Sequence, residues 1–202
     1  MANRQTNGDE RARQILAQEA ARIIVDQGIE DYRLAKLKAA ERLGMRGRGS
    51  LPGNAEIEKA VSEHLQLFGR DLHVDLLRVL RRAALSAMEV LAPFTPRLVG
   101  PVLHGTASAH SPVNLHVFVD DVELVAFRLQ ESSVPYRPFE RRLKSRRDRV
   151  ESFAAFRFAQ GESDIEATVF PFDGVRQAPI SPVDGKPMRR ADKSAILKLL
   201  ED

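Results

Sequence analysis

The 202-residue sequence contains no cysteine. A disulfide framework, a thiolate metal site and a cysteine nucleophile are therefore excluded, and with them zinc fingers and thiol proteases. No stretch approaches the roughly 18 consecutive apolar residues of a membrane-spanning helix. The first residues also lack the apolar segment of a secretory signal. From these absences we expect a cytoplasmic protein with no membrane partner.

Positive charge is concentrated in one segment, although the formal net charge of +3 is mild. Residues 137 to 149 include seven basic and two acidic residues. Such a patch raises the local concentration of anions. An edge strand or hairpin tip that is kept solvated by its charges has the same composition, so both interpretations stay open. The candidate nucleic-acid-binding residues are Arg141, Arg142, Arg146 and Arg147.

The first half of the chain is typical of amphipathic helices. Apolar residues recur at helical spacing and are closed by glycine or proline, which predicts helices over residues 9–28, 31–44, 54–68 and 71–91. A glycine-rich stretch over residues 45–53 indicates a linker. We therefore predict an N-terminal helical region and linker over residues 1–53, and an α/β domain over residues 54–202.

Beyond Pro96 the pattern changes to short apolar runs of β type. Strands are predicted over residues 98–104, 113–119 and 165–170, with 153–159 as the hairpin partner of the last. A helix over residues 120–132 separates the second strand from this hairpin, and Asp192 is predicted to cap a final short helix. The fold class is therefore α+β, with mixed α and β elements: N-terminal helices and a small mixed β-sheet.

Strand parity groups the polar residues of two of these strands. Successive side chains of a strand point to opposite faces, so Asn114 and His116 share one face of their strand. By the same rule Glu166 and Thr168 share one face of theirs.

The segment 103–117 carries a resemblance to a known family. Gly105-Thr106 precedes a short turn, and Ser111-Pro112-Val113-Asn114-Leu115 begins the next strand. This arrangement resembles the core of the nucleotidyltransferase superfamily, the polymerase-β-like fold. In that family one strand ends in Gly-Ser or Gly-Gly, and the next carries Ser-Asp-hydrophobic-Asp-hydrophobic. The resemblance covers roughly residues 71–171 and implies a sheet of nucleotidyltransferase type. Through residues 28–32 and 181–185 the chain is also similar to bacterial proteins sometimes labelled as nucleotidyltransferases.

The glycine and hydroxyl residues of this segment would contact a nucleotide if the resemblance holds. Glycine lets the backbone approach a triphosphate, a hydroxyl donates to phosphate oxygen, and a turn presents backbone N–H groups to anions. The resemblance therefore implies a nucleotide-binding set made of Gly105, Thr106, Ser108 and Ser111.

The acidic residues of the family are replaced in this chain. In the family, two aspartates and a third carboxylate hold two Mg²⁺ ions that drive the transfer. Here Pro112 and Asn114 stand in the two aspartate positions, and a shift by two residues puts Asn114 and His116 there instead. The candidate catalytic residues are then Asn114, His116 and Glu166, the last in place of the third carboxylate. The resemblance implies Mg²⁺ as a cofactor, but an amide, an imidazole and one carboxylate make a poor cage for it.

Three functional hypotheses follow. The first is a nucleotidyltransferase-like protein that binds a nucleotide or nucleic-acid phosphate, with its catalytic carboxylates lost. The second is a non-enzymatic interaction module whose arginine-rich hairpin binds RNA, DNA or an acidic protein. The third is an active transferase, which requires a further carboxylate close to Glu166, with Asp120, Asp164 and Asp173 as the candidates.

Two further patterns allow a structural interpretation beside a functional one. His104, His110 and His116 are evenly spaced, but they lack the carboxylates that usually support metal-bound imidazoles. The proline-rich loop over residues 172–187 either folds over the binding site or serves as a structural strap.

Overall fold

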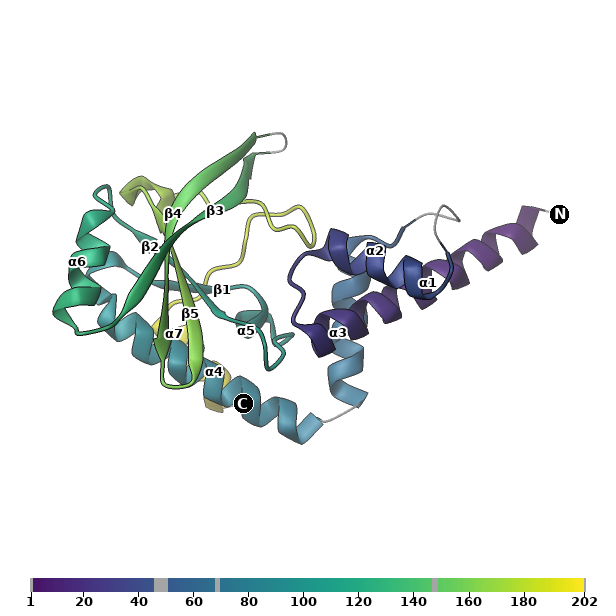
Figure 1. Ribbon diagram of the computed structural model, residues 1–202, viewed down its shortest axis with the longest axis horizontal. Coiled ribbons are helices and arrows are strands. Elements are labelled where there is room, and N and C mark those ends of the chain that lie inside the picture. The colour runs from purple at the N-terminus through teal and green to yellow at the C-terminus, as the bar shows by residue number, and fades with distance from the viewer. Residues whose placement is uncertain (1, 46–50, 68–69, 147–148, 202) are drawn as a thin grey trace. The chain divides into compact units, whose positions relative to one another are not determined.

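The computed structural model describes residues 2–45, 51–67, 70–146 and 149–201 (Figure 1). The chain divides into two compact units. The helical unit comprises Met1–Val74 with Thr106–His110, and the sheet unit comprises Asp75–Gly105 with Ser111–Asp202. The α+β class is confirmed. The domain boundary predicted after residue 53 stays a prediction. None of the described helices is long and apolar enough to cross a membrane.

The helical unit is built from three helices with an alanine-rich core. They are α1 (Ala2–Gln27), α2 (Tyr32–Arg42) and α3 (Asn54–Leu67). Small side chains such as Ala20 and Ala39 are fully buried, with larger ones such as Ile57 filling the spaces between the helices. Helix α2 begins where predicted, because the Asp31 carboxylate accepts hydrogen bonds from the first backbone N–H groups of the helix. Helix α1 begins before the predicted residue 9. The prediction missed its first turns because their sequence is polar and carries no apolar periodicity.

The segment Thr106–His110 is attached to the helical unit by specific contacts. The Thr106 hydroxyl donates to Glu58 Oε1 of α3 at 2.6 Å, and the Tyr32 hydroxyl donates to the other oxygen of the same carboxylate. Gly28 has a φ of 64°, and a Cβ at this position would lie 2.6 Å from the Cβ of His110. Glycine is therefore required at residue 28 by its backbone angle and by this close approach.

The sheet unit contains one five-stranded sheet in the order β1-β2-β5-β4-β3. Strands β2 and β5 pair in parallel, and the other neighbours are antiparallel. The strands are β1 (Arg97–Val99), β2 (Val113–Phe118), β3 (Tyr136–Arg146), β4 (Arg149–Gln160) and β5 (Ser163–Phe170).

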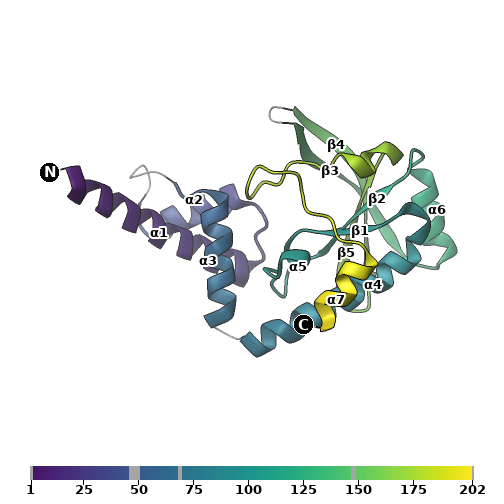
Figure 2. The same cartoon turned by 180° about the vertical axis from the view of Figure 1, so that it is seen from behind.

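Helices cover one face of the sheet. Helices α4 (Arg70–Val90) and α7 (Lys193–Glu201) lie behind the sheet in Figure 1 and in front of it in Figure 2. Helix α6 (Glu123–Glu131) is tied to α4 by a hydrogen bond from Arg128 Nε to a carbonyl oxygen at 2.9 Å. The side chains that point to this face are apolar and fully buried, among them Leu98, Leu115, Val117, Ile165 and Ala167. The opposite face of the sheet carries the polar residues.

Two strand predictions need correction. The strand predicted over residues 98–104 is wrong, because β1 ends at Val99 and the chain continues as the one-turn helix α5 (Pro101–His104). Gly100 makes the turn with a φ of 75°, and the proline that follows has the backbone angle of a first helical residue. Strand β3 was not among the strands predicted from apolar runs, although an edge strand was one interpretation of its charged segment. It is the edge of the sheet, where such charge is common.

Candidate functional site

The polar face of the sheet is organised by the parallel pairing of β2 with β5. In this register Asn114 lies opposite Glu166, and His116 lies opposite Thr168. All four residues are buried. Strand parity predicted that Asn114 shares a face with His116 and Glu166 with Thr168, and the register places both of these pairs on the same face of the sheet. Burying polar groups is costly unless they are hydrogen-bonded, so each of them needs a partner.

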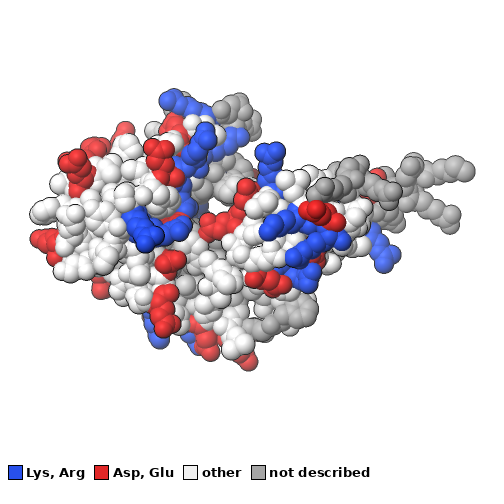
Figure 3. Space-filling model, viewed as in Figure 1, with Lys and Arg blue, Asp and Glu red and all other residues white. Residues whose placement is uncertain are grey.

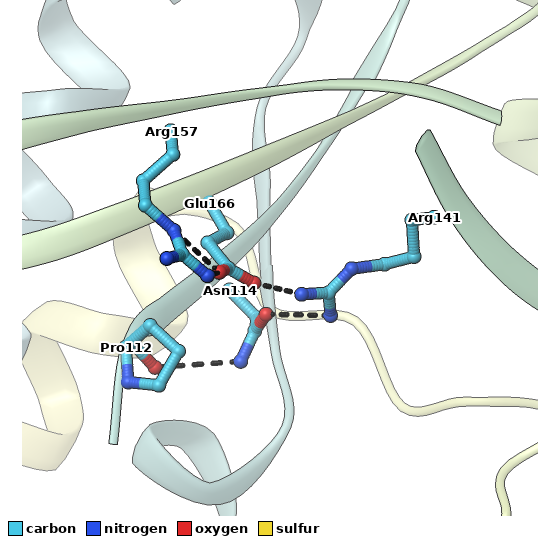
Figure 4. Close-up of polar contacts among 5 residues, drawn as sticks. All are labelled: Pro112, Asn114, Arg141, Arg157 and Glu166. Carbon is cyan, nitrogen blue, oxygen red and sulfur yellow. Dashed lines mark hydrogen bonds and ion pairs between the residues drawn. The ribbon is translucent and has the colours of Figure 1, made fainter. Parts of the chain in front are cut away.

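Two arginines supply the partners of Glu166, whose side chain is only 1% exposed. Arg157 lies directly opposite it on β4 and donates to Oε1, from Nε at 2.9 Å and also from Nη2. Arg141 of β3 donates from Nη2 to Oε2 and from Nη1 to the Asn114 side-chain oxygen, the latter at 2.9 Å. Figure 4 shows the two guanidinium groups approaching Glu166 from opposite sides. We refer to Asn114, Arg141, Arg157 and Glu166 as the arginine site.

The side-chain nitrogen of Asn114 is held by the chain that precedes β2. Its Nδ2 donates to the Pro112 carbonyl oxygen at 3.3 Å. A Cβ at Gly100 would lie 3.5 Å from the same nitrogen. The glycine beside the arginine site is therefore Gly100, which sequence reasoning overlooked in favour of Gly105. The signal was present, because Gly100-Pro101 directly follows a strand.

His116 is neutral at pH 7 and is held by a third arginine. Its Nδ1 accepts a hydrogen bond from Arg190 Nε at 3.1 Å. Burial above all, and then the positive charges of Arg190 and Arg141, hold the pKa of His116 well below its ordinary value. The imidazole therefore acts as a hydrogen-bond acceptor rather than as a cation.

Arg190 also fixes the segment that follows β5. Its guanidinium lies over the rings of Phe118 and Phe170, 4.8 Å and 5.3 Å from their centroids. Its Nη1 donates to the Gly174 carbonyl oxygen at 2.8 Å, within the 3-10 helix η2 (Phe172–Arg176). Burial lowers the pKa of Arg190 to about 10, so the group stays charged at pH 7.

The predicted nucleotide-binding residues are divided between the two units. Gly105 and Ser111 belong to the sheet unit, and Thr106 and Ser108 belong to the helical unit. Gly105 ends α5 in the left-handed conformation with a φ of 79°. The Thr106 hydroxyl donates to a carboxylate of α3, and Ser108 is buried. A nucleotide-binding role for these four residues stays a prediction.

The predicted arginines of the hairpin point to different faces. Arg141 belongs to the arginine site, while Arg142 is exposed on the other face of β3. The side chain of Arg146 and the whole of Arg147 lie outside the described residues. Figure 3 shows basic side chains gathered over the β3–β4 hairpin.

Sequence reasoning missed Arg157. It is the one charged residue within the otherwise apolar run Phe153-Ala154-Ala155-Phe156-Arg157-Phe158-Ala159. This single charge in an apolar run is the signal that could have identified Arg157 from the sequence.

The donor set of this face does not fit Mg²⁺. Both oxygens of Glu166 and the side-chain oxygen of Asn114 already accept hydrogen bonds from guanidinium groups. Mg²⁺ requires several oxygen ligands in octahedral geometry, and two adjacent guanidinium charges would repel it. Among the described residues, no group of three histidine, aspartate or glutamate side chains is placed to hold a metal ion.

The further carboxylates that an active transferase would need have other places in the fold. Asp120 accepts a hydrogen bond from the Phe172 backbone N–H at 3.0 Å, beyond the end of β5. Asp164 lies two residues before Glu166 on β5 and is exposed. Asp173 lies in η2 and is also exposed. The contacts of the described Glu166 carboxylate are with arginines.

No protein-family model and no curated protein matches the sequence. The resemblance to nucleotidyltransferases therefore rests on the sequence pattern and stays a prediction.

Proposed function

We propose that the sheet unit binds a phosphate group of a nucleotide or nucleic acid at the arginine site, as a nucleotidyltransferase-like protein that has lost its catalytic carboxylates. One observation carries this proposal: two arginines converge on a buried carboxylate, while 55% of the Arg157 side chain stays exposed. The expected location is the cytoplasm, where nucleotides and nucleic acids are present.

The geometry of the two guanidinium groups suits an oxyanion. An arginine has five N–H donors in a rigid fork that matches phosphate, and Arg157 uses those of Nε and Nη2 for Glu166. The guanidinium carbons of both arginines lie 5.7 Å from the centroid of the Phe139 ring, and this cation–π contact helps to hold the two groups in place. Glu166 positions the arginines, and the exposed N–H groups of Arg157 are directed to the ligand.

Transfer chemistry has little support in this arrangement. Asn114 stands where the resemblance places an aspartate, and Glu166 is neutralised by its arginines. The positive charge that metal ions would supply to a phosphate comes instead from Arg141 and Arg157. The proposal therefore includes binding without Mg²⁺.

Calorimetric titration tests this proposal. The full-length protein is titrated with ATP, GTP, CTP and UTP, each with EDTA and with Mg²⁺. We expect binding in EDTA that weakens about 10-fold or more in Arg157→Gln, because one charged hydrogen bond contributes about 1.5–3 kcal/mol.

Arg142→Gln is the matched control. It removes the same charge from the same hairpin but on the opposite face, so nucleotide binding should stay within about twofold of wild type. Binding that requires Mg²⁺ would overturn the metal-free site. An absence of binding to all four nucleotides would overturn the nucleotide-binding function.

A second candidate function is favoured by the other face of the hairpin. Arg142, Lys144 and Arg149 are exposed there and at the end of the hairpin, where they could contact successive phosphates of RNA or DNA, or an acidic protein. Polymer binding through phosphates weakens steeply with salt. If an oligonucleotide binds through the hairpin, Arg142→Gln should reduce the salt dependence of its affinity, measured by fluorescence anisotropy, and Arg157→Gln should not.

A further inference from the structure

Helix α2 exposes its larger apolar side chains and buries its smaller ones. It packs on the rest of the helical unit through small residues, since Ala35, Ala39 and Ala40 are buried. Leu34 and Leu37 are instead 43% and 53% exposed. A surface helix normally turns its larger apolar residues toward the core and its polar residues toward solvent. The outer side of α2 therefore has the composition of a helix face that packs against a partner.

Four exposed residues form one stripe on this outer side: Arg33, Leu34, Leu37 and Glu41. They lie together because residues three and four apart on a helix share a face. Arg33 lies one turn before Leu37, and Glu41 lies one turn after it. Figure 1 shows α2 on the near side of the helical unit, and in Figure 3 basic and acidic side chains lie together over it. We refer to these four residues as the α2 face.

The order of charges along the α2 face makes it complementary to itself. Two copies of α2 can pack antiparallel about a two-fold axis at Leu37. Arg33 of each copy then meets Glu41 of the other, and the symmetry makes this contact twice. Leu37 meets its own copy on the axis, with Leu34 packed beside it. In a parallel pair each charge would instead meet its own copy, and the contacts would be repulsive.

The α2 face is also preformed and carries no net charge. The Asp31 carboxylate caps the start of α2, and Lys36 Nζ donates to Asn54 Oδ1 at the start of α3 at 2.6 Å. A helix that is already fixed in this way costs little ordering on association. One basic and one acidic residue give the face no preference for nucleic acid or for an anionic membrane, which both select positive charge.

We infer that the α2 face pairs with the same face of a second copy of this chain, in a two-fold symmetric, antiparallel dimer. This inference does not depend on the arginine site, because α2 belongs to the helical unit. Helix α2 has only 11 residues, so the contact is smaller than a standard stable interface of roughly 1,200–2,000 Å². We therefore expect a weak dimer, with a dissociation constant on the order of 100 µM.

Sedimentation equilibrium of the full-length protein tests the dimer. The weight-average mass should rise from that of one chain toward that of two as the protein concentration passes through this range. Leu37→Glu places two like charges on the two-fold axis, so this variant should stay monomeric. Leu124→Glu is the matched control, because Leu124 is 48% exposed on α6 of the sheet unit. It should dimerise as the wild type does.

Charge reversal tests the antiparallel pairing. Arg33→Glu and Glu41→Arg each turn both attractive contacts of the symmetric dimer into repulsive ones, so each should weaken dimerisation about fivefold or more. The double variant Arg33→Glu/Glu41→Arg restores opposite charges across the axis. Its affinity should return to within about twofold of the wild type.

An introduced cysteine locates the axis, because the chain has none of its own. Leu37→Cys should form a disulfide between copies in mild oxidation, since its side chains meet on the axis. Leu34→Cys is the control. In the antiparallel dimer the two copies of residue 34 are about 9 Å apart along the helices. This exceeds the roughly 4.4–6.8 Å between the Cα atoms of a disulfide, so far less cross-linking is expected.

Each of these measurements can contradict the inference. A mass that stays at one chain throughout the concentration range would overturn it, and so would self-association that survives Leu37→Glu. A double charge variant as weak as the single variants would mean that Arg33 and Glu41 do not pair across the axis. Equal cross-linking at residues 34 and 37 would indicate random encounters or parallel packing, and either would overturn the antiparallel dimer.

Discussion

Neutralising Glu166 should destabilise the protein, and the size of the effect follows from its surroundings. Glu166→Gln leaves two guanidinium groups without their counter-charge. Removing one partner of a buried ion pair costs about 3–5 kcal/mol, whereas an exposed pair contributes about 0–1 kcal/mol. The carboxylate is 1% exposed, but the side chains of Arg141 and Arg157 are 24% and 55% exposed. We therefore expect an intermediate loss of about 2 kcal/mol in the free energy of unfolding.

Urea unfolding measures this loss in the sheet unit. The chain has two tyrosines and no tryptophan, so a Tyr32→Phe background leaves Tyr136 of β3 as the fluorescent reporter. The midpoint should fall at an unchanged slope. Asp164→Asn is the matched control, since it removes a carboxylate from the same face of the same strand but at an exposed position. Its effect should stay within about 0.5 kcal/mol.

An unchanged or raised stability of Glu166→Gln would refute the reasoning. A carboxylate kept for a metal ion would be uncompensated in the metal-free protein, so replacing it with an amide would remove the cost of burying its charge. In that case saturating Mg²⁺ would also stabilise the wild-type protein, because a ligand that binds the folded state raises its stability.

Three further predictions concern single side chains. The pKa of His116 is lowered on folding, so the unfolded state takes up its proton more readily. Stability should therefore be full above about pH 6.5 and should fall as the pH drops below that value, and His116→Asn should remove this part of the pH profile measured by urea unfolding. Thr106→Val should destabilise the helical unit by about 1 to 2 kcal/mol in thermal unfolding, through loss of a hydrogen bond to a carboxylate, and Thr106→Ser should restore most of it. Gly28→Ala and Gly44→Ala both place a side chain at a positive φ, but only the first would clash with His110, so Gly28→Ala should lower the melting temperature more. Equal effects of the two glycine substitutions would mean that the clash is relieved at no cost.

Strand parity and periodicity predicted the framework of the polar face from the sequence. Alternation along β2 and β5 grouped Asn114 with His116 and Glu166 with Thr168, and the structure places both pairs on one face. This succeeded because the period of a strand depends on the backbone alone. The partners of these residues could not be predicted in the same way, because they depend on the order of strands in the sheet.

The missed features have specific physical causes. Arg157 lies on a strand that was predicted to pair with β5, and its charge was overlooked. Arg141 reaches Glu166 from β3, two strands away across the sheet, and no local pattern in the sequence shows this contact. The turn at Gly100 was overlooked, although Gly100-Pro101 separates the apolar residues of β1 from those of α5 and is itself a turn signal. The nucleotide-binding and catalytic roles predicted from the motif stay predictions.

The parallel pairing of β2 with β5 has a consequence for the order of folding. Strands β3, β4 and β5 follow one another along the chain, and Arg157 and Glu166 are nine residues apart. Asn114 reaches them only when β2 pairs with β5 across α6, β3 and β4. Closing a longer loop costs more entropy, so contacts between residues close in sequence tend to form first. We therefore expect Glu166 to meet Arg157 while the meander is still open to water, so that the carboxylate is already neutralised when the polar face closes over it.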